Sequence, residues 1–196
     1  GFAFHQEGKL DAAEEAYQNV LQVNSNNAEV YNLLGVLKLQ QNDVISAINW
    51  IEKAVELKPD VYFYETLIQA YVRAGLFKQI VAKQNEILEK FPNNFSLLFN
   101  IALANKNVKN IKAAIKFYNQ ALKINPASYL AWFNLSHLYS IEGEAENAVS
   151  ALEICKKIKP NDIDTDYFLS LALMRTKNYE KGLKLFETRL CRETAT

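Results

Sequence analysis

The stretch Tyr129–Pro160 reads YLAWFNLSHLYSIEGEAENAVSALEICKKIKP and contains two helical patterns separated by Gly143. The apolar residues of each half recur at intervals of three and four, which places them on one face of a helix. They are Trp132, Leu135 and Tyr139 in the first half and Ala148, Leu152 and Cys155 in the second. Pro160 ends the second pattern because proline lacks the amide hydrogen that a helix requires. The stretch predicts two helices joined as a hairpin.

The same arrangement recurs along the chain, marked by its prolines. The four prolines are Pro59, Pro92, Pro126 and Pro160, at spacings of 33, 34 and 34 residues. Alignment on them brings equivalent residues of the hairpins into register. The first helices align the bulky residues Tyr31, Tyr64, Leu98 and Trp132 and then the mostly small residues Gly35, Ile68, Ala102 and Ser136. The second helices align Ala47, Ile80, Ala114 and Ala148.

This pattern resembles the tetratricopeptide repeat, which has a period of about 34 residues and the sequence pattern W-x2-L-G-x2-Y, then A-x3-F, then P. The resemblance covers essentially the whole chain. It implies an all-α fold, a right-handed α-solenoid of stacked antiparallel helix hairpins, in one domain over residues 1–196. The expected repeats are 1–27 (partial), 28–60, 61–94, 95–128, 129–162 and 163–196 (degenerate).

The aligned positions also predict details of packing. Gly35 is expected to face Ala47 where the two helices of the second repeat cross. In the third repeat, Ile68 and Ile80 occupy the equivalent positions, so its two helices should lie further apart. Helix N-termini are expected at the capping residues Asp43 and Asn110.

The last repeat departs from the pattern, with Asp166 at the aromatic position, Gly182 in place of alanine and Arg189 at the next small position. Its segment 179–190 is similar to the final repeat of bacterial glycosyltransferases that carry amino-terminal tetratricopeptide repeats. That resemblance implies that any catalytic residues lie beyond Thr196.

An acidic cluster precedes these residues, with Asp162, Asp164 and Asp166 at alternate positions. The loop lacks the glycine and the terminal glutamate of an EF-hand calcium site. Aspartate is also a preferred residue at helix starts, so helix capping is the expected role.

The composition argues against several classes of protein. The chain has 22 basic and 22 acidic residues, which removes the positive charge expected of a nucleic-acid-binding protein. No apolar run approaches the roughly 20 residues of a membrane span. Cys155 and Cys191 fit neither a disulfide framework nor a metal site, and Cys155 is expected to pack in the core. A reducing, cytoplasmic location is the simplest interpretation.

Motifs for catalysis are absent from the sequence. It contains no glycine-rich phosphate loop, no H-E-x-x-H and no G-x-S-x-G. His5 and His137 are too far apart in a solenoid to share a ligand. We therefore expect no catalytic site, cofactor or metal within this chain.

In the tetratricopeptide family, a stripe on the first helices lines a concave groove where ligand segments bind. The residues expected to contact a partner there are Asn32, Tyr62, Glu65, Gln69, Arg73, Phe99, Asn100, Leu103, Phe133, Asn134, His137, Tyr167, Leu171 and Arg175. The arginines and asparagines are expected to orient the ligand. Asn100 and Asn134 match groove asparagines of family members that bind extended peptide. For Phe99 and Phe133, packing between neighbouring first helices is an equally good interpretation.

The leading hypothesis is a non-catalytic protein–protein interaction scaffold that binds a partner peptide or helix in this groove. The lysines with which chaperone-binding relatives hold a terminal carboxylate are missing at the matching positions. The alternative is a substrate-recruiting segment of a larger bacterial glycosyltransferase. Self-association through the incomplete end repeats is a third hypothesis.

Overall fold

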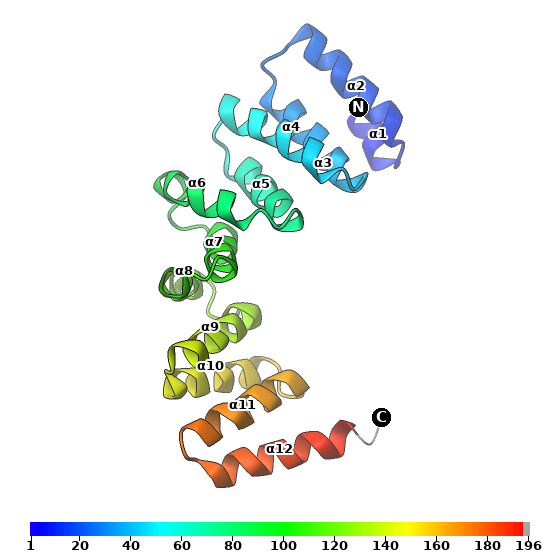
Figure 1. Cartoon of the computed structure of the whole chain (residues 1–196). Coiled ribbons are helices and arrows are strands. Elements are labelled where there is room, and N and C mark those ends of the chain that lie inside the picture. The colour runs from blue at the N-terminus through cyan, green and yellow to red at the C-terminus, as the bar shows by residue number, and fades with distance from the viewer. Residues whose placement is uncertain (194–196) are drawn as a thin grey trace. The chain divides into compact units, whose positions relative to one another are not determined.

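The computed structural model describes residues 1–193, with side chains described for residues 1–187, and all regular secondary structure in this part is α-helical (Figure 1). The helices are α1 (Phe2–Gln6), α2 (Leu10–Val23), α3 (Ala28–Gln40), α4 (Val44–Leu57), α5 (Val61–Arg73), α6 (Phe77–Lys90), α7 (Phe95–Asn107), α8 (Ile111–Ile124), α9 (Tyr129–Glu142), α10 (Ala145–Ile158), α11 (Ile163–Arg175) and α12 (Tyr179–Glu193). The first helices α3, α5, α7, α9 and α11 begin at the starts of the repeats expected from the sequence.

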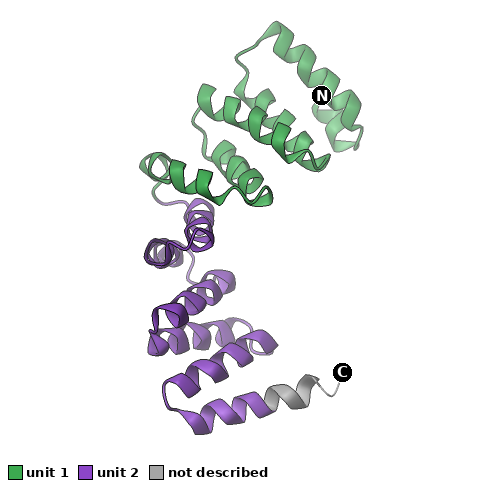
Figure 2. Ribbon diagram, viewed as in Figure 1, with its two compact units in different colours: residues 1–92 green, residues 93–196 purple. Residues whose placement is uncertain are grey.

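The chain divides into two compact units, residues 1–92 and 93–196 (Figure 2). Unit 1 contains α1–α6 and unit 2 contains α7–α12. Within each unit, consecutive helices pair as hairpins, and the second helix of one hairpin packs on the first helix of the next. This stacking confirms the all-α, paired-helix fold. The assignment of the whole chain to one domain stays a prediction.

Capping side chains begin most of the first helices. Asn27, Asp60, Asn94, Ser128 and Asp162 each accept a hydrogen bond from a backbone amide of the first turn. The predicted cap at Asp43 is confirmed, because its side chain accepts from the Ser46 amide at 3.1 Å. Such bonds satisfy amides that have no partner within the helix.

Asn110 is the residue before α8, as predicted, but the predicted capping hydrogen bond from its side chain is absent. Its Nδ2 instead donates to Oδ1 of the buried Asn105, at 3.1 Å. The Asn110 side chain is therefore hydrogen-bonded to Asn105 and not to a backbone amide of the first turn of α8.

Small residues set how closely the helices of a hairpin approach. A Cβ on Gly35 would lie 2.2 Å from Cγ1 of Ile51 and 3.2 Å from the Ala47 carbonyl oxygen, which confirms the expected crossing. At Gly182, a Cβ would lie 2.8 Å from Cγ of Met174, so glycine lets α12 approach α11 closely. Arg189 lies outside the side chains that the structure describes.

The third hairpin is the open one. Ile68 and Ile80 are both fully buried at the crossing positions. α5 and α6 make far fewer close approaches than the helices of the other complete hairpins. The prediction of a wider separation is confirmed, and its cause is the volume of two isoleucines where the other hairpins carry at least one smaller residue.

Burial also confirms the predicted role of Cys155. Its side chain is fully buried, and its Sγ donates to the Tyr129 carbonyl oxygen at 3.8 Å. Burial raises the pKa of this thiol to about 12, and the nearby Asp162 charge adds to the increase. The thiol is therefore an inert packing group rather than a nucleophile.

Candidate interaction surface

The predicted contact residues fall into two sets, one in each unit. In unit 1 they lie on α3 and α5. In unit 2 they lie on α7, α9 and α11. The two sets are described separately below, and the surface formed by α7, α9 and α11 is called the first-helix surface of unit 2.

In unit 1, Asn32 is wrong as a contact residue. Only 2% of it is exposed, because α3 is covered by α2, α4 and α5. Its Oδ1 has no hydrogen-bond partner among the described residues. Tyr62 (55% exposed) and Gln69 do reach solvent, whereas Glu65 is half-buried. The accessible predicted residues of unit 1 therefore lie along one face of α5, without a contribution from α3.

Two arginines at equivalent repeat positions play the same structural part. Nη1 of Arg73 donates to the Leu39 carbonyl oxygen at 3.1 Å, and Nη1 of Arg175 donates to the Ser140 carbonyl oxygen at 3.1 Å. In each case the carbonyl lies in the last turn of the preceding first helix, and the Leu39 oxygen also accepts from the Asn42 amide at 3.2 Å. The guanidinium groups thus join consecutive repeats. The expectation that they only orient a ligand is too narrow.

In unit 2, Phe99 and Phe133 are half-buried, and both rings pack against other side chains. The Phe99 ring meets the buried Tyr118 ring edge to face, with centroids 5.5 Å apart. Phe133 stacks on Tyr129 and packs against the core cluster that contains Leu152 and Leu169. Packing on the neighbouring first helix is therefore confirmed for Phe133, whose ring meets Phe168 of α11, whereas Phe99 packs on α8 of its own hairpin.

Asn100 and Asn134 are also engaged within the protein. Each Nδ2 donates to the carbonyl oxygen four residues earlier in its own helix, Ser96 and Leu130 respectively, at 2.9 Å. A ligand backbone would have to compete with these bonds. Asn134 retains a second role through its Oδ1, described below.

His137, Leu171 and Arg175 come together around a pocket of about 260 Å³ between α9 and α11. Phe168 and Ile141 complete much of its lining. The His137 ring lies 4.3 Å from the Phe168 ring, centroid to centroid, and edge to face. Phe168 was not among the predicted contact residues. In the sequence it aligns with Asn100 and Asn134, at 34-residue intervals, which are both predicted contact residues.

The structure adds a charged group that the site prediction also omitted. Lys106, in the last turn of α7, is half-buried, and its Nζ donates to Oδ1 of Asn134 at 2.6 Å. Among the side chains described, no carboxylate oxygen lies within 4.0 Å of this amine. The first-helix surface of unit 2 therefore carries an amine without an acidic partner.

The protonation of this surface follows from burial. Burial lowers the pKa of Lys106 from its ordinary 10.5. Burial, and secondly the nearby Lys106 charge, lowers the pKa of His137 below 6.5. His137 is thus mainly uncharged at neutral pH, and its neutral ring packs at a steep angle to the Phe168 ring.

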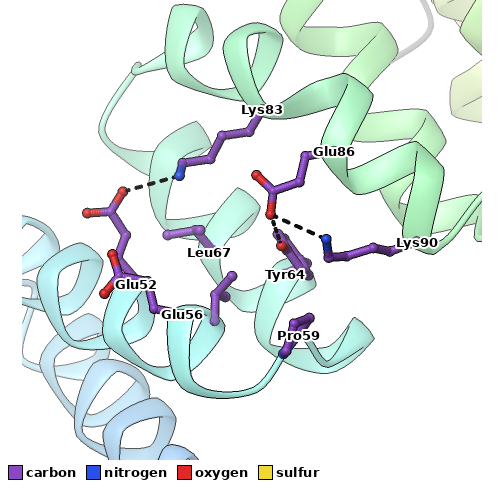
Figure 3. Close-up of a pocket in the computed structure, with 9 residues that line it drawn as sticks. Glu52, Glu56, Pro59, Tyr64, Leu67, Lys83, Glu86 and Lys90 are labelled. Carbon is purple, nitrogen blue, oxygen red and sulfur yellow. Dashed lines mark hydrogen bonds and ion pairs between the residues drawn. The ribbon is translucent and has the colours of Figure 1, made fainter.

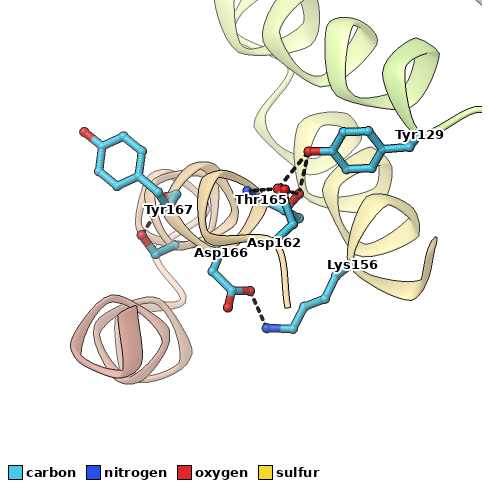
Figure 4. A network of polar contacts seen from close by, with 7 residues as sticks. Tyr129, Lys156, Asp162, Thr165, Asp166 and Tyr167 are labelled. Atoms are coloured by element: carbon cyan, nitrogen blue, oxygen red, sulfur yellow. Dashed lines mark hydrogen bonds and ion pairs between the residues drawn. The ribbon is translucent and has the colours of Figure 1, made fainter. Parts of the chain in front are cut away.

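The acidic cluster near α11 has structural roles (Figure 4). Asp162 is the cap, as predicted, and accepts from the Thr165 amide at 2.8 Å and the Tyr129 hydroxyl at 2.7 Å. Asp166 is not a cap. It is 1% exposed at the aromatic position and pairs with Nζ of Lys156 on α10 at 2.5 Å. No group of three or more potential metal ligands occurs in the described part of the chain.

A second cavity, of about 230 Å³, lies in unit 1 between α4, α5 and α6 (Figure 3). The open third hairpin provides the space for it. Glu86 accepts from the Tyr64 hydroxyl and lies 3.9 Å from Nζ of Lys90, while Glu52 lies 4.0 Å from Nζ of Lys83. The glutamates and lysines that line this cavity largely neutralise one another, so its charge does not indicate a particular class of ligand.

Family models match most of the same repeats. One described as TPR repeat matches residues 1–42, one described as Tetratricopeptide repeat matches residues 28–61 and 95–128, and another with that description matches 117–150. Together these matches cover more than half of the chain. The chain belongs to the tetratricopeptide repeat family, whose members are protein-interaction scaffolds.

Among known proteins, the chain is similar to Superkiller protein 3 of Schizosaccharomyces pombe, with 25% identity over 89% of this chain and 13% of the relative. It is 22% identical to the human Protein O-mannosyl-transferase TMTC3, over 92% of this chain and 22% of the relative. The chain thus spans less than a quarter of the length of these curated relatives.

Solved structures show the same fold. MamA is 23% identical with a TM-score of 0.79, covering 85% of this chain and 92% of that protein. YrrB, described as a TPR protein with an unusual peptide-binding site, is 20% identical with a TM-score of 0.79, covering 90% and 92%. In residues 1–193, no helix has the length and apolar character to cross a membrane.

Proposed function

We propose that this chain is a non-catalytic interaction module and that the first-helix surface of unit 2 binds a segment of a partner protein. The observation that carries the proposal is the pocket between α9 and α11. Its lining is mainly apolar, and its volume of about 260 Å³ has room for one apolar side chain of a bound peptide.

Exposed apolar residues lie on this surface both at the pocket, where Ile141 lines it, and further along α9, at Leu130. On α9, Leu130 is 58% exposed and Ile141 is 65% exposed. Apolar groups left in water next to a pocket are typical of a binding surface. Of the predicted contact residues, His137 and Leu171 fit this role best, because both line the pocket. Leu103 and Tyr167 are partly exposed on the neighbouring helices α7 and α11. The name of YrrB, which refers to a peptide-binding site, adds support from a protein of the same fold.

Peptides for the test come from selection of a random displayed peptide library on the immobilised chain, followed by synthesis of the strongest binder. The decisive variant is Ile141→Asp, with Ile45→Asp on α4 as its matched control, because Ile45 is 64% exposed. Both changes place a charge in water and should leave thermal unfolding largely unchanged. We expect Ile141→Asp to weaken binding at least about tenfold, since it introduces a charge into an apolar contact.

The control should bind as the unmodified chain does. Equal affinity of all three proteins for the peptide would contradict the proposed site. Failure to select any binding peptide would contradict the proposed function itself.

A second candidate is a substrate-recruiting segment of a larger glycosyltransferase. It is favoured by the similarity to the human O-mannosyl-transferase, of which this chain would span 22%. Under this proposal, the partner segment is the acceptor protein, and catalysis belongs to another domain of the same polypeptide. The coding sequence that follows Thr196 is the direct test. A sugar-transfer domain there would favour this candidate, and a different domain or a stop codon would oppose it.

A further inference from the structure

We propose that the bound segment carries an internal aspartate or glutamate whose carboxylate pairs with Lys106, next to the apolar side chain that enters the α9–α11 pocket. The proposal rests on the proposed function and specifies the chemistry of the partner. The observation behind it is the half-buried amine of Lys106, which lies between α7 and α9 with an amide oxygen as its neighbour.

The hydrogen bonds of Lys106 are incomplete. A lysine ammonium has three donors, and the described contacts use one of them, to Oδ1 of Asn134. An amide oxygen carries no net charge, so this half-buried positive charge has no negative partner among the described side chains. Partly buried charges of this kind are costly unless they are paired. A carboxylate from a partner would supply both the missing acceptor and the missing charge.

The surrounding charges favour an acidic ligand. His137 is uncharged at neutral pH, and Arg175 adds a second positive group on α11. On the same helices, Asp166 is committed to Lys156, Asp164 lies in the first turn of α11, and Glu142 is exposed at the end of α9. None of these carboxylates lies within 4.0 Å of the Lys106 amine. The Lys106 charge is therefore not paired with a carboxylate of these helices.

An acidic side chain within a segment fits this surface better than a chain-terminal carboxylate. Apolar residues lie near Lys106 on more than one helix: Leu103 lies one turn before it on α7, and Ile141 and Leu171 line the pocket of His137, which is close enough to respond to the Lys106 charge. A segment that crosses the surface would thus contact apolar groups before and after its acidic residue. The inferred ligand has an acidic residue with apolar neighbours on both sides.

The test uses the peptide selected from the random library. Its affinity is measured for the unmodified chain and for Lys106→Gln, which removes the charge and keeps a polar side chain. Lys112→Gln on α8 is the matched control, because Lys112 is exposed and outside this surface. We expect Lys106→Gln to weaken binding about tenfold or more, in line with the loss of one member of a partly buried charge pair, and the control to be unaffected.

The peptide supplies a second variant that leaves the protein intact. Replacement of its acidic residue by the corresponding amide should cause a loss similar to that of Lys106→Gln, and the two changes together should cost little more than either alone. Amidation of the peptide's carboxyl terminus should have no effect. Even if Lys106→Gln failed to fold, the peptide variants on the unmodified chain would still decide the question.

Two outcomes would overturn the inference and spare the proposed function. In the first, Ile141→Asp abolishes binding while Lys106→Gln and the neutral peptide bind as tightly as their parents. In the second, amidation of the terminus abolishes binding, which would mean that a terminal carboxylate is the bound group. If Ile141→Asp also binds normally, the proposed site fails together with this inference.

Discussion

The first helices of the two units carry different residues at equivalent repeat positions. Asn32 on α3 corresponds to Phe133 on α9, and Asn32 is buried whereas Phe133 borders an open surface. Four residues further on, Val36 corresponds to His137, which lines a pocket. The repeats share one backbone fold, so the binding properties of each unit depend on the volume and charge of its side chains. The comparison indicates that a stripe defined by position is not automatically a binding surface.

The largest expected difference between the two units concerns stability. Phe133→Ala should destabilise unit 2 by about 2–3 kcal/mol, somewhat less than for a fully buried phenylalanine, because the ring packs on Tyr129, Phe168 and the core. Tyr62→Ala in unit 1 should change stability by less than about 0.5 kcal/mol, since Tyr62 is mostly exposed. Urea unfolding measures both. Equal effects would mean that Phe133 faces solvent and that the described packing is wrong.

The crossing residues provide the next test. Gly35→Leu should destabilise the protein by about 1–3 kcal/mol, because even a Cβ would overlap Ile51. Ser136→Ala, at the equivalent position in unit 2, should cost at most about 1 kcal/mol, since it removes only the hydrogen bond from its Oγ to the Phe133 carbonyl oxygen. An unchanged urea midpoint for Gly35→Leu would refute the register of the repeats.

The sequence was sufficient for the crossing at Gly35, the cap at Asp43 and the open third hairpin, because these depend on local spacing and on residue size within one repeat. It was insufficient for the roles of Lys106 and Arg175. Those roles depend on where long side chains end, and their partners Asn134 and Ser140 lie in another repeat. Likewise, the burial of Asn32 results from three neighbouring helices and not from its own helix pattern.

Variants of Arg73 and Arg175 distinguish a contribution to stability from a contribution to peptide binding. Arg73→Met and Arg175→Met should each destabilise the protein by about 1 kcal/mol, because each removes a hydrogen bond to a terminal helix carbonyl. Only Arg175→Met should also weaken binding of the selected peptide, since Arg175 lines the pocket. If both variants weakened peptide binding equally, the inference that only unit 2 carries the binding surface would be contradicted.

The smallest expected effect is a dependence of stability on pH. Because burial lowers the pKa of His137, the unfolded chain takes up a proton before the folded chain as the pH falls. Its contribution to stability is therefore fully present above about pH 6.5 and decreases as the pH falls below that value. We expect His137→Gln to reduce the pH dependence of the urea midpoint between neutral and mildly acidic conditions. An identical dependence in the variant and the parent would contradict a buried, neutral His137.

The most direct measurement for the central claim is amide hydrogen exchange of the chain with and without the selected peptide. If the peptide binds at the pocket, amide exchange should become slower in α9 and α11, around residues 137–141 and 168–175, and should stay unchanged in α3 and α5. Protection confined to α3 and α5, or to the cavity between α4 and α6, would contradict that claim.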